Sequence, residues 1–459
     1  MSREVFILGG KRTPMTEYVG ALKDVKAIDL GAAAARGALA ATGVAAEEID
    51  HTIIGNALQT SGDAIYGARH VALKAGVPAD RPALTVNRLC GSGIQSIING
   101  AQMIMLGEAR NALVGGMESM SMAPHVIYGA RSGFALGQGK LEDSLMVALL
   151  DTYCNTTMAG TAENLARRYE ISREDQDQYA LRSQVEAKRA QDAGIFAEEI
   201  VAVEVKTRKG VKVVDRDDHL RPDTTIEGLA KLPTAFSKDG FVTAGNASGI
   251  VDGAAALVIA GEEFVKERNV QPLGRIVSWA YAGVDPDVMG IGPVPAVRKA
   301  LEKAGLKLAE IDLVEVNEAF AGQYLAVEKE LGLDRARTNV NGGAIALGHP
   351  LAASGTRLVL TSLLELRRRG GRYCLATACI GGGQGIAIIV EKQYRTANDE
   401  VGTMNDEWKT SRLHFIVHRS DFIVSFHSVA RRPSSSKEPP DEPTFAPDVF
   451  PPLAQIRNG

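Results

Sequence analysis

The stretch RGALAATGVAAEEID at residues 36–50 decides the fold, because it returns later in the chain as RKALEKAGLKLAEID at residues 298–312. Seven residue types recur at the same offset, 262 positions apart. In each copy a segment with helical periodicity (28–42 and 294–304) ends at a glycine, and a β-branched run follows (51–54 and 311–316). The sequence therefore predicts two halves with one plan, and such helix-then-strand units form parallel sheets covered by helices.

Composition limits the possible binding partners and cellular locations of the chain. The chain has 459 residues, 45% of them hydrophobic and 23% charged, which is enough for two or three domains. A net charge of -4 is spread over both signs without a basic block, which argues against nucleic acid and membrane surfaces as partners. Four cysteines without a CxxC spacing indicate reduced thiols rather than a metal site. No signal-peptide pattern or membrane-length apolar run is present, so a cytoplasmic location is expected.

Four segments are predicted along the chain. The first half occupies 1–118 and is completed by about 248–272, and the second half occupies 273–392. Between them, 119–247 forms an inserted loop domain expected to cover the substrate site; it contains a helix pair (161–169 and 173–192) and a hairpin (203–214). The segment 393–459, with seven prolines, is expected to be disordered.

Cys90 is the first candidate for chemistry. It stands in the block NRLCGSG (residues 87–93), where a short β run ends, and Ile94 then begins an apolar helix face. The thiol is therefore predicted at a helix N-terminus, where main-chain N–H groups and the helix dipole favour the nucleophilic thiolate. From this block alone, a packed structural cysteine is an equal alternative.

His349 lies on a similar turn, GGAIALGHP (342–350), with Pro350 suited to a first helical turn. A single histidine is more often structural than catalytic. Moving from Cys90 by the repeat offset leads to position 352, three residues from His349, so the two residues occupy similar places in the two halves. If the halves pack about a pseudo-twofold axis, both turns reach one site and form a nucleophile–base pair.

Two more blocks follow predicted strands of the second half. NEAF (317–320) places Asn317 at a strand end, where sites of α/β proteins collect, and where it can orient a water or donate a hydrogen bond. CIGGG (379–383) follows the strand 373–378, which predicts an exposed thiol for Cys379, whereas Cys374 is predicted in the core. The glycines free main-chain N–H groups for an oxyanion hole.

These four blocks, in this order and with TAGNASG (243–249) as a fifth, resemble the signature blocks of the thiolase family, and the similarity covers roughly residues 2–391. The resemblance implies an α/β thiolase fold, with two duplicated βαβαβαββ halves in a five-layered αβαβα arrangement and an inserted loop domain. It also implies a homotetramer made of two tight dimers. Acyl-CoA and CoA would be substrates and products, with no tightly bound cofactor and no metal.

By this resemblance the chain is an acyl-CoA acyltransferase, most simply an acetyl-CoA C-acetyltransferase, that works by a ping-pong scheme. His349 activates Cys90, which takes the acyl group, and Cys379 removes a proton from the Cα of a second acyl-CoA. Claisen condensation follows, and thiolysis of a 3-ketoacyl-CoA is the reverse. Oxyanion roles fall to His349 with a water on Asn317, and to the N–H groups of Cys90 and Gly381. The positions that match the family's CoA contacts are Arg221, Phe236, Ala244, Ser248, Ala319 and Phe320, with Met158 at the acyl end.

Three positions depart from the family pattern. Thr157 precedes Met158 where biosynthetic acetoacetyl-CoA thiolases have histidine; PLAASG (350–355) has alanine where glycine is frequent; and Gly228 replaces a serine that often contacts the adenine region of CoA. Acyl selectivity is therefore open. A ketoacyl-ACP synthase is the alternative enzyme, but such enzymes have histidine or asparagine in place of Cys379. A catalytically silent lipid carrier is the non-enzyme alternative, against which the full set of catalytic residues argues.

Overall fold

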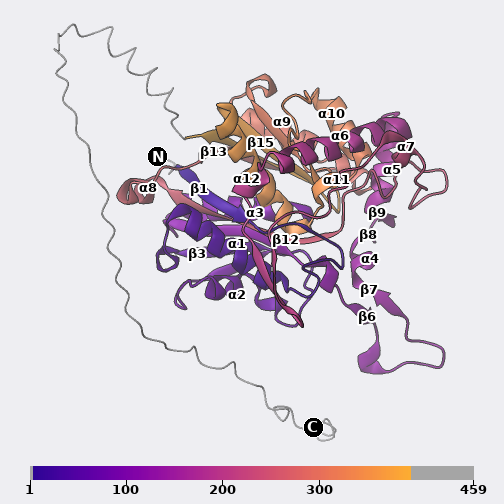
Figure 1. Ribbon diagram of the computed structural model, residues 1–459, viewed down its shortest axis with the longest axis horizontal. Coiled ribbons are helices and arrows are strands. Elements are labelled where there is room, and N and C mark those ends of the chain that lie inside the picture. The colour runs from indigo at the N-terminus through magenta and orange to yellow at the C-terminus, as the bar shows by residue number, and fades with distance from the viewer. Residues whose placement is uncertain (1–3, 394–459) are drawn as a thin grey trace, which may run out of the picture. The chain divides into compact units, whose positions relative to one another are not determined.

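The computed structural model describes residues 4–393 (Figure 1). The predicted disordered extension lies outside the described residues, apart from Gln393. Within the described part, ten strands form one continuous hydrogen-bonded sheet in the order β14-β15-β16-β13-β1-β12-β5-β3-β4, with β2 paired to β12. These strands are β1 (Val5–Arg12), β2 (Thr16–Glu17), β3 (His51–Gly55), β4 (Ala83–Val86), β5 (Asn111–Glu118), β12 (Val251–Gly261), β13 (Gly274–Gly283), β14 (Leu313–Val316), β15 (Tyr373–Ile380) and β16 (Gln384–Lys392).

The strand order shows the duplication directly. In the first half, β3 is parallel to β5, which is antiparallel to β12, which is antiparallel to β1. In the second half, β14, β15, β16 and β13 repeat these directions in the same order. The place of β4 is taken there by a single parallel bridge between Val314 and Thr338. The halves join where Phe6 and Ile7 of β1 pair with β13.

Two helices from opposite halves, α3 (Ser92–Leu106) and α12 (Leu351–Arg369), share the middle of the molecule (Figure 1). They touch main chain to main chain, because a Cβ added at Gly93 would lie 2.5 Å from the nitrogen of Thr356, and one added at Gly355 would lie 2.6 Å from the nitrogen of Ile94. Gly93 and Gly355 are separated by the repeat offset. The pseudo-twofold relation between the halves therefore brings the N-terminal ends of both helices together.

Apolar faces on both sides of each half-sheet fix the layers. The central core unites the inner faces of both half-sheets with α3 and α12, for example Ile97, Val114, Leu358 and Ile388, all fully buried. Separate cores lie under the helices outside the first half and under those outside the second. The outer helices are α1 (Ala27–Thr42), α2 (Gly67–Lys74), α8 (Glu262–Arg268), α9 (Pro293–Ala304) and α10 (Ala321–Leu331). This helix–sheet–helix–sheet–helix arrangement confirms the predicted fold class.

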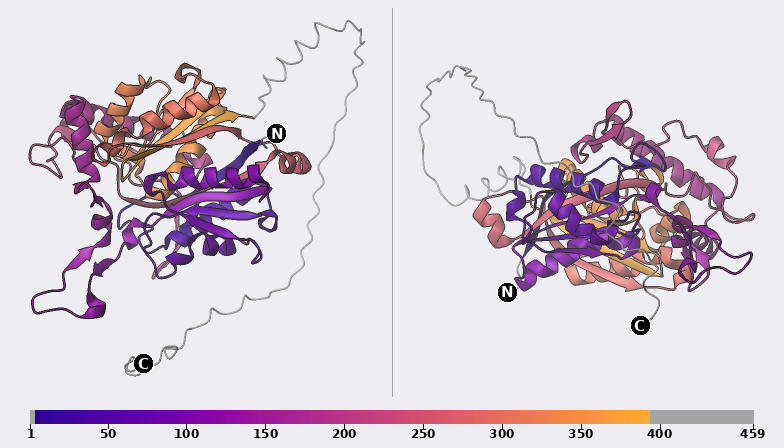
Figure 2. Two further views of the ribbon diagram at one scale, coloured as in Figure 1. Left: turned by 180° about the vertical axis from the view of Figure 1, so that it is seen from behind. Right: turned by 90° about the horizontal axis from the view of Figure 1, so that it is seen from below.

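The segment between β5 and β12 is built differently from the two halves, with short strands and separate helices. Its first part projects away from the half-sheets, and its later helices lie against the second half (Figure 2). The longest helix begins at a capping box between Ser172 and Asp175, at the predicted start. Its elements are β6 (His125–Ile127), β7 (Leu141–Asp143), α4 (Ser144–Ala148), β8 (Leu150–Asp151), β9 (Thr156–Thr157), α5 (Met158–Arg168), α6 (Arg173–Asp192), β10 (Val203–Thr207), β11 (Gly210–Val214) and α7 (Ile226–Ala230).

Candidate active site at the two converging helix starts

A tight turn presents Cys90 two residues before α3. Residues Leu89–Gly91 form a single 3-10 turn, and Leu89 has a left-handed φ of 46°, which is strained for a branched side chain. The turn is held by its neighbours: the Leu89 N–H donates to Asn87 Oδ1 (2.9 Å), and the Ser92 hydroxyl donates to the Leu89 carbonyl (2.7 Å). Local hydrogen bonds therefore hold the strained turn in which Cys90 lies.

The surroundings of the Cys90 thiol raise its proton affinity. The residue is half-buried and packs against Met120, Leu145 and Leu351. Burial raises the pKa of Cys90 to about 11, the N–H groups of Gly381 and of Cys90 itself act in the opposite direction, and the charge of Glu118 adds to the rise. In the resting site desolvation outweighs these N–H groups, so the raised pKa of Cys90 runs against the expectation that the helix start favours thiolate. The thiol needs a base.

His349 is placed to be that base. It is buried, lies two residues before α12, and its main-chain N–H donates to the carbonyl of Gly249 (2.9 Å). Burial, with the positive charge of Arg357 as a second cause, lowers the pKa of His349 to about 3, so the imidazole is neutral at physiological pH.

Hydrogen bonds assign the tautomer of this imidazole. Nδ1 of His349 lies 2.6 Å from Ser354 Oγ, which in turn lies 3.3 Å from the Pro350 carbonyl. Since the hydroxyl donates to that carbonyl, Nδ1 carries the proton and donates to Ser354. Nε2 then carries the lone pair, which accepts a long hydrogen bond from Asn317 Nδ2 (3.4 Å). This is the form required of a proton acceptor.

Asn317 and Gly381 complete the polar part of the site. Asn317 is fully buried directly after β14, and its Oδ1 has no hydrogen-bond partner among the protein atoms of the described residues. The unpaired amide oxygen leaves room for the water that the family resemblance implies on Asn317. Gly381 lies close enough to Cys90 for its N–H to favour the thiolate, and a Cβ there would meet Leu89 Cδ1 at 3.1 Å.

Cys379 is not exposed, which corrects the sequence prediction. Strand β15 continues through Ile380, two residues beyond its predicted end, so Cys379 belongs to the strand and is fully buried. It packs with Met289 and Ala319, and burial, with the neighbouring Cys90 as a second cause, raises its pKa. The electrostatic effect of Cys90 shows that the two thiols are neighbours. Cys374 is buried, as predicted.

A cavity of about 150 Å³ opens at the Cys90 thiol. The predicted site residues that line it are Cys90, Met158, Phe236, Ser248, Ala319, Phe320, His349 and Gly381. Arg221 and Ala244, also predicted CoA contacts, line a second hollow of about 470 Å³ together with Gly228. The loop 243–249 borders both hollows, with Ala244 and Gly245 at the second and Ala247 to Gly249 at the first.

Some functional neighbours were not found from the sequence. Ser354 was noted only as part of the block after His349, although it sets the tautomer. Glu118 and Arg357 were not singled out, because their partners come from distant parts of the chain. Thr157 has a structural task, since its hydroxyl accepts the N–H of Gly160 (3.1 Å) and caps α5 directly before Met158.

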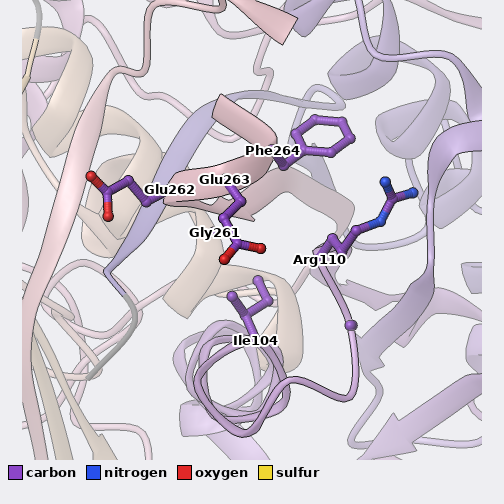
Figure 3. A pocket seen from close by; sticks show the side chains of 7 residues that line it. Ile104, Arg110, Gly261, Glu262, Glu263 and Phe264 are labelled. Carbon is purple, nitrogen blue, oxygen red and sulfur yellow. The ribbon is translucent and has the colours of Figure 1, made fainter. Parts of the chain in front are cut away.

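Other parts of the described chain offer no comparable chemistry. A hollow of about 60 Å³ beside α8 is lined by acidic, basic and apolar side chains, with Glu262 and Arg110 pointing to opposite sides (Figure 3). It contains neither a thiol nor an imidazole. Within residues 4–393, no group of three or more histidine, cysteine, aspartate or glutamate side chains could hold a metal ion. No helix in this range is both long enough and apolar enough to cross a membrane.

Comparisons with known proteins agree with this geometry. Residues 5–263 match the family described as "Thiolase, N-terminal domain", and residues 270–392 match "Thiolase, C-terminal domain". The mitochondrial 3-ketoacyl-CoA thiolase of Homo sapiens is 57% identical over 390 residues, which are 85% of this chain and 98% of the relative. An acetyl-CoA acetyltransferase of Rhizobium meliloti is 50% identical over 389 residues, 84% of this chain and 98% of the relative.

A solved structure extends the agreement to three dimensions. The crystal structure of the human mitochondrial 3-ketoacyl-CoA thiolase in complex with CoA matches with a TM-score of 0.83 and 56% identity, over 85% of this chain and 98% of that chain. With both family domains, a thiol and a neutral imidazole at the two helix starts, and a cavity that both line, the chain belongs to the thiolase family of acyltransferases, which use CoA thioesters.

Proposed function

We propose that the chain is a 3-ketoacyl-CoA thiolase that cleaves 3-ketoacyl-CoA with CoA and catalyses the reverse condensation, through an acyl group on Cys90. The observation that carries this is the pairing of a high-pKa thiol with a neutral, buried imidazole at one apolar cavity. Such a pair transfers a proton only when a substrate is attacked, so the thiolate does not accumulate in water.

In the first half-reaction, the Cys90 proton passes to Nε2 of His349 while Sγ attacks the substrate carbonyl. The leaving group takes that proton back, so His349 serves as base and then as acid. The N–H groups of Cys90 and Gly381 stabilise the tetrahedral oxyanion. Their contribution is supported by the effect of both N–H groups on the Cys90 thiolate.

Cys379 is the proposed acid and base at the substrate Cα in the second half-reaction. Its burial beside Cys90 keeps it protonated at rest. When it is ionised, a buried thiolate without strong hydrogen-bond donors is a strong base, which is what the weakly acidic Cα proton requires. His349, with a water on Asn317, would hold the enolate oxygen.

The cavity supports acyl chains longer than acetyl. Its lining includes these apolar side chains: Leu89, Met120, Leu149, Met158, Met289 and Leu351. An apolar protein cavity of about 150 Å³ can hold a six-carbon ring such as benzene. We therefore place the preferred 3-ketoacyl-CoA among short and medium chains rather than at acetoacetyl-CoA alone. The Homo sapiens relative with this substrate in its name, at 57% identity, also supports this choice.

A chain-length series tests the proposal. Thiolysis is measured with CoA and 3-ketoacyl-CoA of about four to sixteen carbons. We expect kcat/KM at about six to eight carbons to equal or exceed the value for acetoacetyl-CoA. Activity confined to acetoacetyl-CoA would favour the acetyl-CoA C-acetyltransferase expected from the sequence. Decarboxylative condensation with a malonyl thioester would instead indicate the synthase alternative.

Location and assembly stay predictions. The expected cytoplasmic location contrasts with the word "mitochondrial" in the name of the Homo sapiens relative, and cell fractionation tests it. The expected homotetramer is tested by light scattering of the purified protein.

A further inference from the structure

Glu118 carries a buried carboxylate for which neither half-reaction has a role. It is the last residue of β5 and is fully buried. Its Oε1 accepts N–H groups from the Asn56 side chain (2.9 Å) and Leu58 (2.9 Å), and its Oε2 accepts those of Ala57 (3.1 Å) and Ala352 (3.1 Å). All four donors are neutral, and burying a carboxylate among neutral groups is unfavourable. The buried carboxylate is therefore best explained by the chain segments that its four hydrogen bonds hold in place.

The donors belong to two walls of the active site. Ala57 and Leu58 follow β3 in the first half and pack in the same cluster as Cys90. Ala352 is the second residue of α12, three residues after His349, and Leu351 beside it also belongs to the Cys90 cluster. One side chain thus joins the wall beside the nucleophile to the helix start that carries the base, across the boundary between the halves.

The His349 segment is held at its other end by a second buried glutamate. Glu318 accepts the N–H of Ile345 (3.1 Å), four residues before His349, and hydroxyl groups of Tyr179 and Ser183 (both 2.7 Å). Those partners come from the second half and the inserted segment, so Glu318 does not reach the Cys90 wall. Of the two glutamates, Glu118 alone connects nucleophile and base.

We propose that Glu118 is a positioning residue for the acyl transfer: its carboxylate ties the 57–58 wall to the first turn of α12 and so fixes His349 relative to Cys90. Proton transfer between the two residues depends on this distance, and a displacement of about 1 Å can cost about 100-fold in rate. The inference rests on Cys90 acylation and is independent of acyl-chain preference.

The titratable groups around the Cys90 thiol provide a second test of this role, namely the pH at which that thiol ionises. Three titratable groups face Cys90: Glu118 at the end of β5, His349 before the start of α12, and Cys379 in β15. Asp252 of β12 faces Glu118. Burial raises the pKa of Glu118 to about 7, so above that pH its charge opposes ionisation of Cys90. Removing the charge should make the thiolate easier to form, even while catalysis becomes slower.

The test uses Glu118→Gln in the full chain. The amide keeps the shape but presents an NH₂ group to two of the four N–H donors. We expect kcat to fall about 10- to 100-fold with KM within about twofold, because the predicted CoA contacts lie elsewhere. Alkylation of Cys90 by iodoacetamide, followed against pH without substrate, should move to lower pH. A folded variant with kcat within about twofold of wild type and an unmoved alkylation curve would overturn the proposal.

Two further variants keep the test decisive. Asn56→Ala removes one of the four hydrogen bonds and retains the charge; we expect a several-fold lower kcat and no shift of the alkylation curve to lower pH. Wild-type kcat in this variant would count against the proposal even if Glu118→Gln fails to fold. Glu199→Gln is the matched control, since Glu199 is a buried acid bonded to Arg12 and Thr361 outside the site. It should lower thermal stability and leave the alkylation curve unchanged.

Discussion

The turn before α3 and the turn before α12 occupy equivalent places in the two halves, yet they carry side chains of opposite proton affinity. At the first turn burial raises the pKa of a thiol to about 11, and at the second it lowers that of an imidazole to about 3. Desolvation acts in both places, and it disfavours the charged form of each group. One environment therefore gives both an uncharged acid and an uncharged base, because the residue types differ.

The difference teaches how a duplicated fold acquires chemistry. Duplication supplies two helix starts that meet near a pseudo-twofold axis, and replacement of single residues then separates their roles. Four substitutions test this pair and the groups around it, from the largest expected effect to the smallest.

Replacing Cys90 by alanine should remove the reaction. Cys90 lines the cavity and would carry the acyl group, so acyl transfer should fall by about 10⁴-fold or more. Mass spectrometry after incubation with acyl-CoA should show the acyl adduct on the wild type and none on Cys90→Ala. Residual activity above about one-hundredth of the wild-type rate would show that Cys90 is dispensable. The pairing of the Cys90 and His349 turns would then not explain the reaction.

His349→Ala should remove the base and leave the nucleophile. We expect acylation to fall by about 10³-fold at neutral pH. Because Cys90 then ionises only into solvent, the remaining rate should rise about tenfold per pH unit up to its pKa of about 11. Stopped-flow acylation between neutral and alkaline pH measures this slope, and a flat profile would show that His349 is not the proton acceptor.

Cys379→Ala should separate the two half-reactions. The variant should still form the acyl adduct on Cys90, while overall condensation falls by about 10²- to 10³-fold, because the Cα proton has no acceptor. Exchange of Cα protons of acetyl-CoA with deuterated water, observed by NMR, should disappear. Unchanged exchange would assign the Cα proton to another group.

Gly355→Ala should push the turns before α3 and α12 apart while the side chains of Cys90 and His349 stay unchanged. The added methyl group would lie 2.6 Å from the Ile94 nitrogen, so we expect a loss of about 1–3 kcal/mol in stability and about a tenfold lower kcat. Gly62→Ala is the control, since a Cβ there meets nothing within 4 Å. Calorimetry and steady-state kinetics give the two values. Equal behaviour of both variants would show that the helix contact does not govern the site.

The sequence revealed the parts of the site that a repeat or a local pattern can show. The offset between residues 36–50 and 298–312 placed Cys90 and His349 in equivalent positions, and the structure has both two residues before a central helix. The apolar face that begins at Ile94 predicted helix α3. The helix predicted at 173–192 is α6, which has the same bounds.

What the sequence did not reveal depends on contacts between distant segments. The partners of Glu118 lie about 60 and 234 residues away, and no local periodicity marks such a pair. Burial of Cys379 was also missed, because the glycines after it suggested an exposed turn while β15 continues to Ile380. The helix start at Cys90 can be recognised locally, whereas the desolvation that raises the pKa of its thiol depends on the whole fold.

The contact between Gly93 and Gly355 has a consequence for predicting activity from sequence. Any substitution at either position acts on nucleophile and base together, because the main chains of α3 and α12 meet there without an intervening side chain. A variant of this kind would be silent in a comparison of catalytic residues, all of which would still be present, and yet it would lose activity. When thiolase sequences are screened for function, the absence of a side chain at positions 93 and 355 is therefore as informative as the presence of Cys90 and His349.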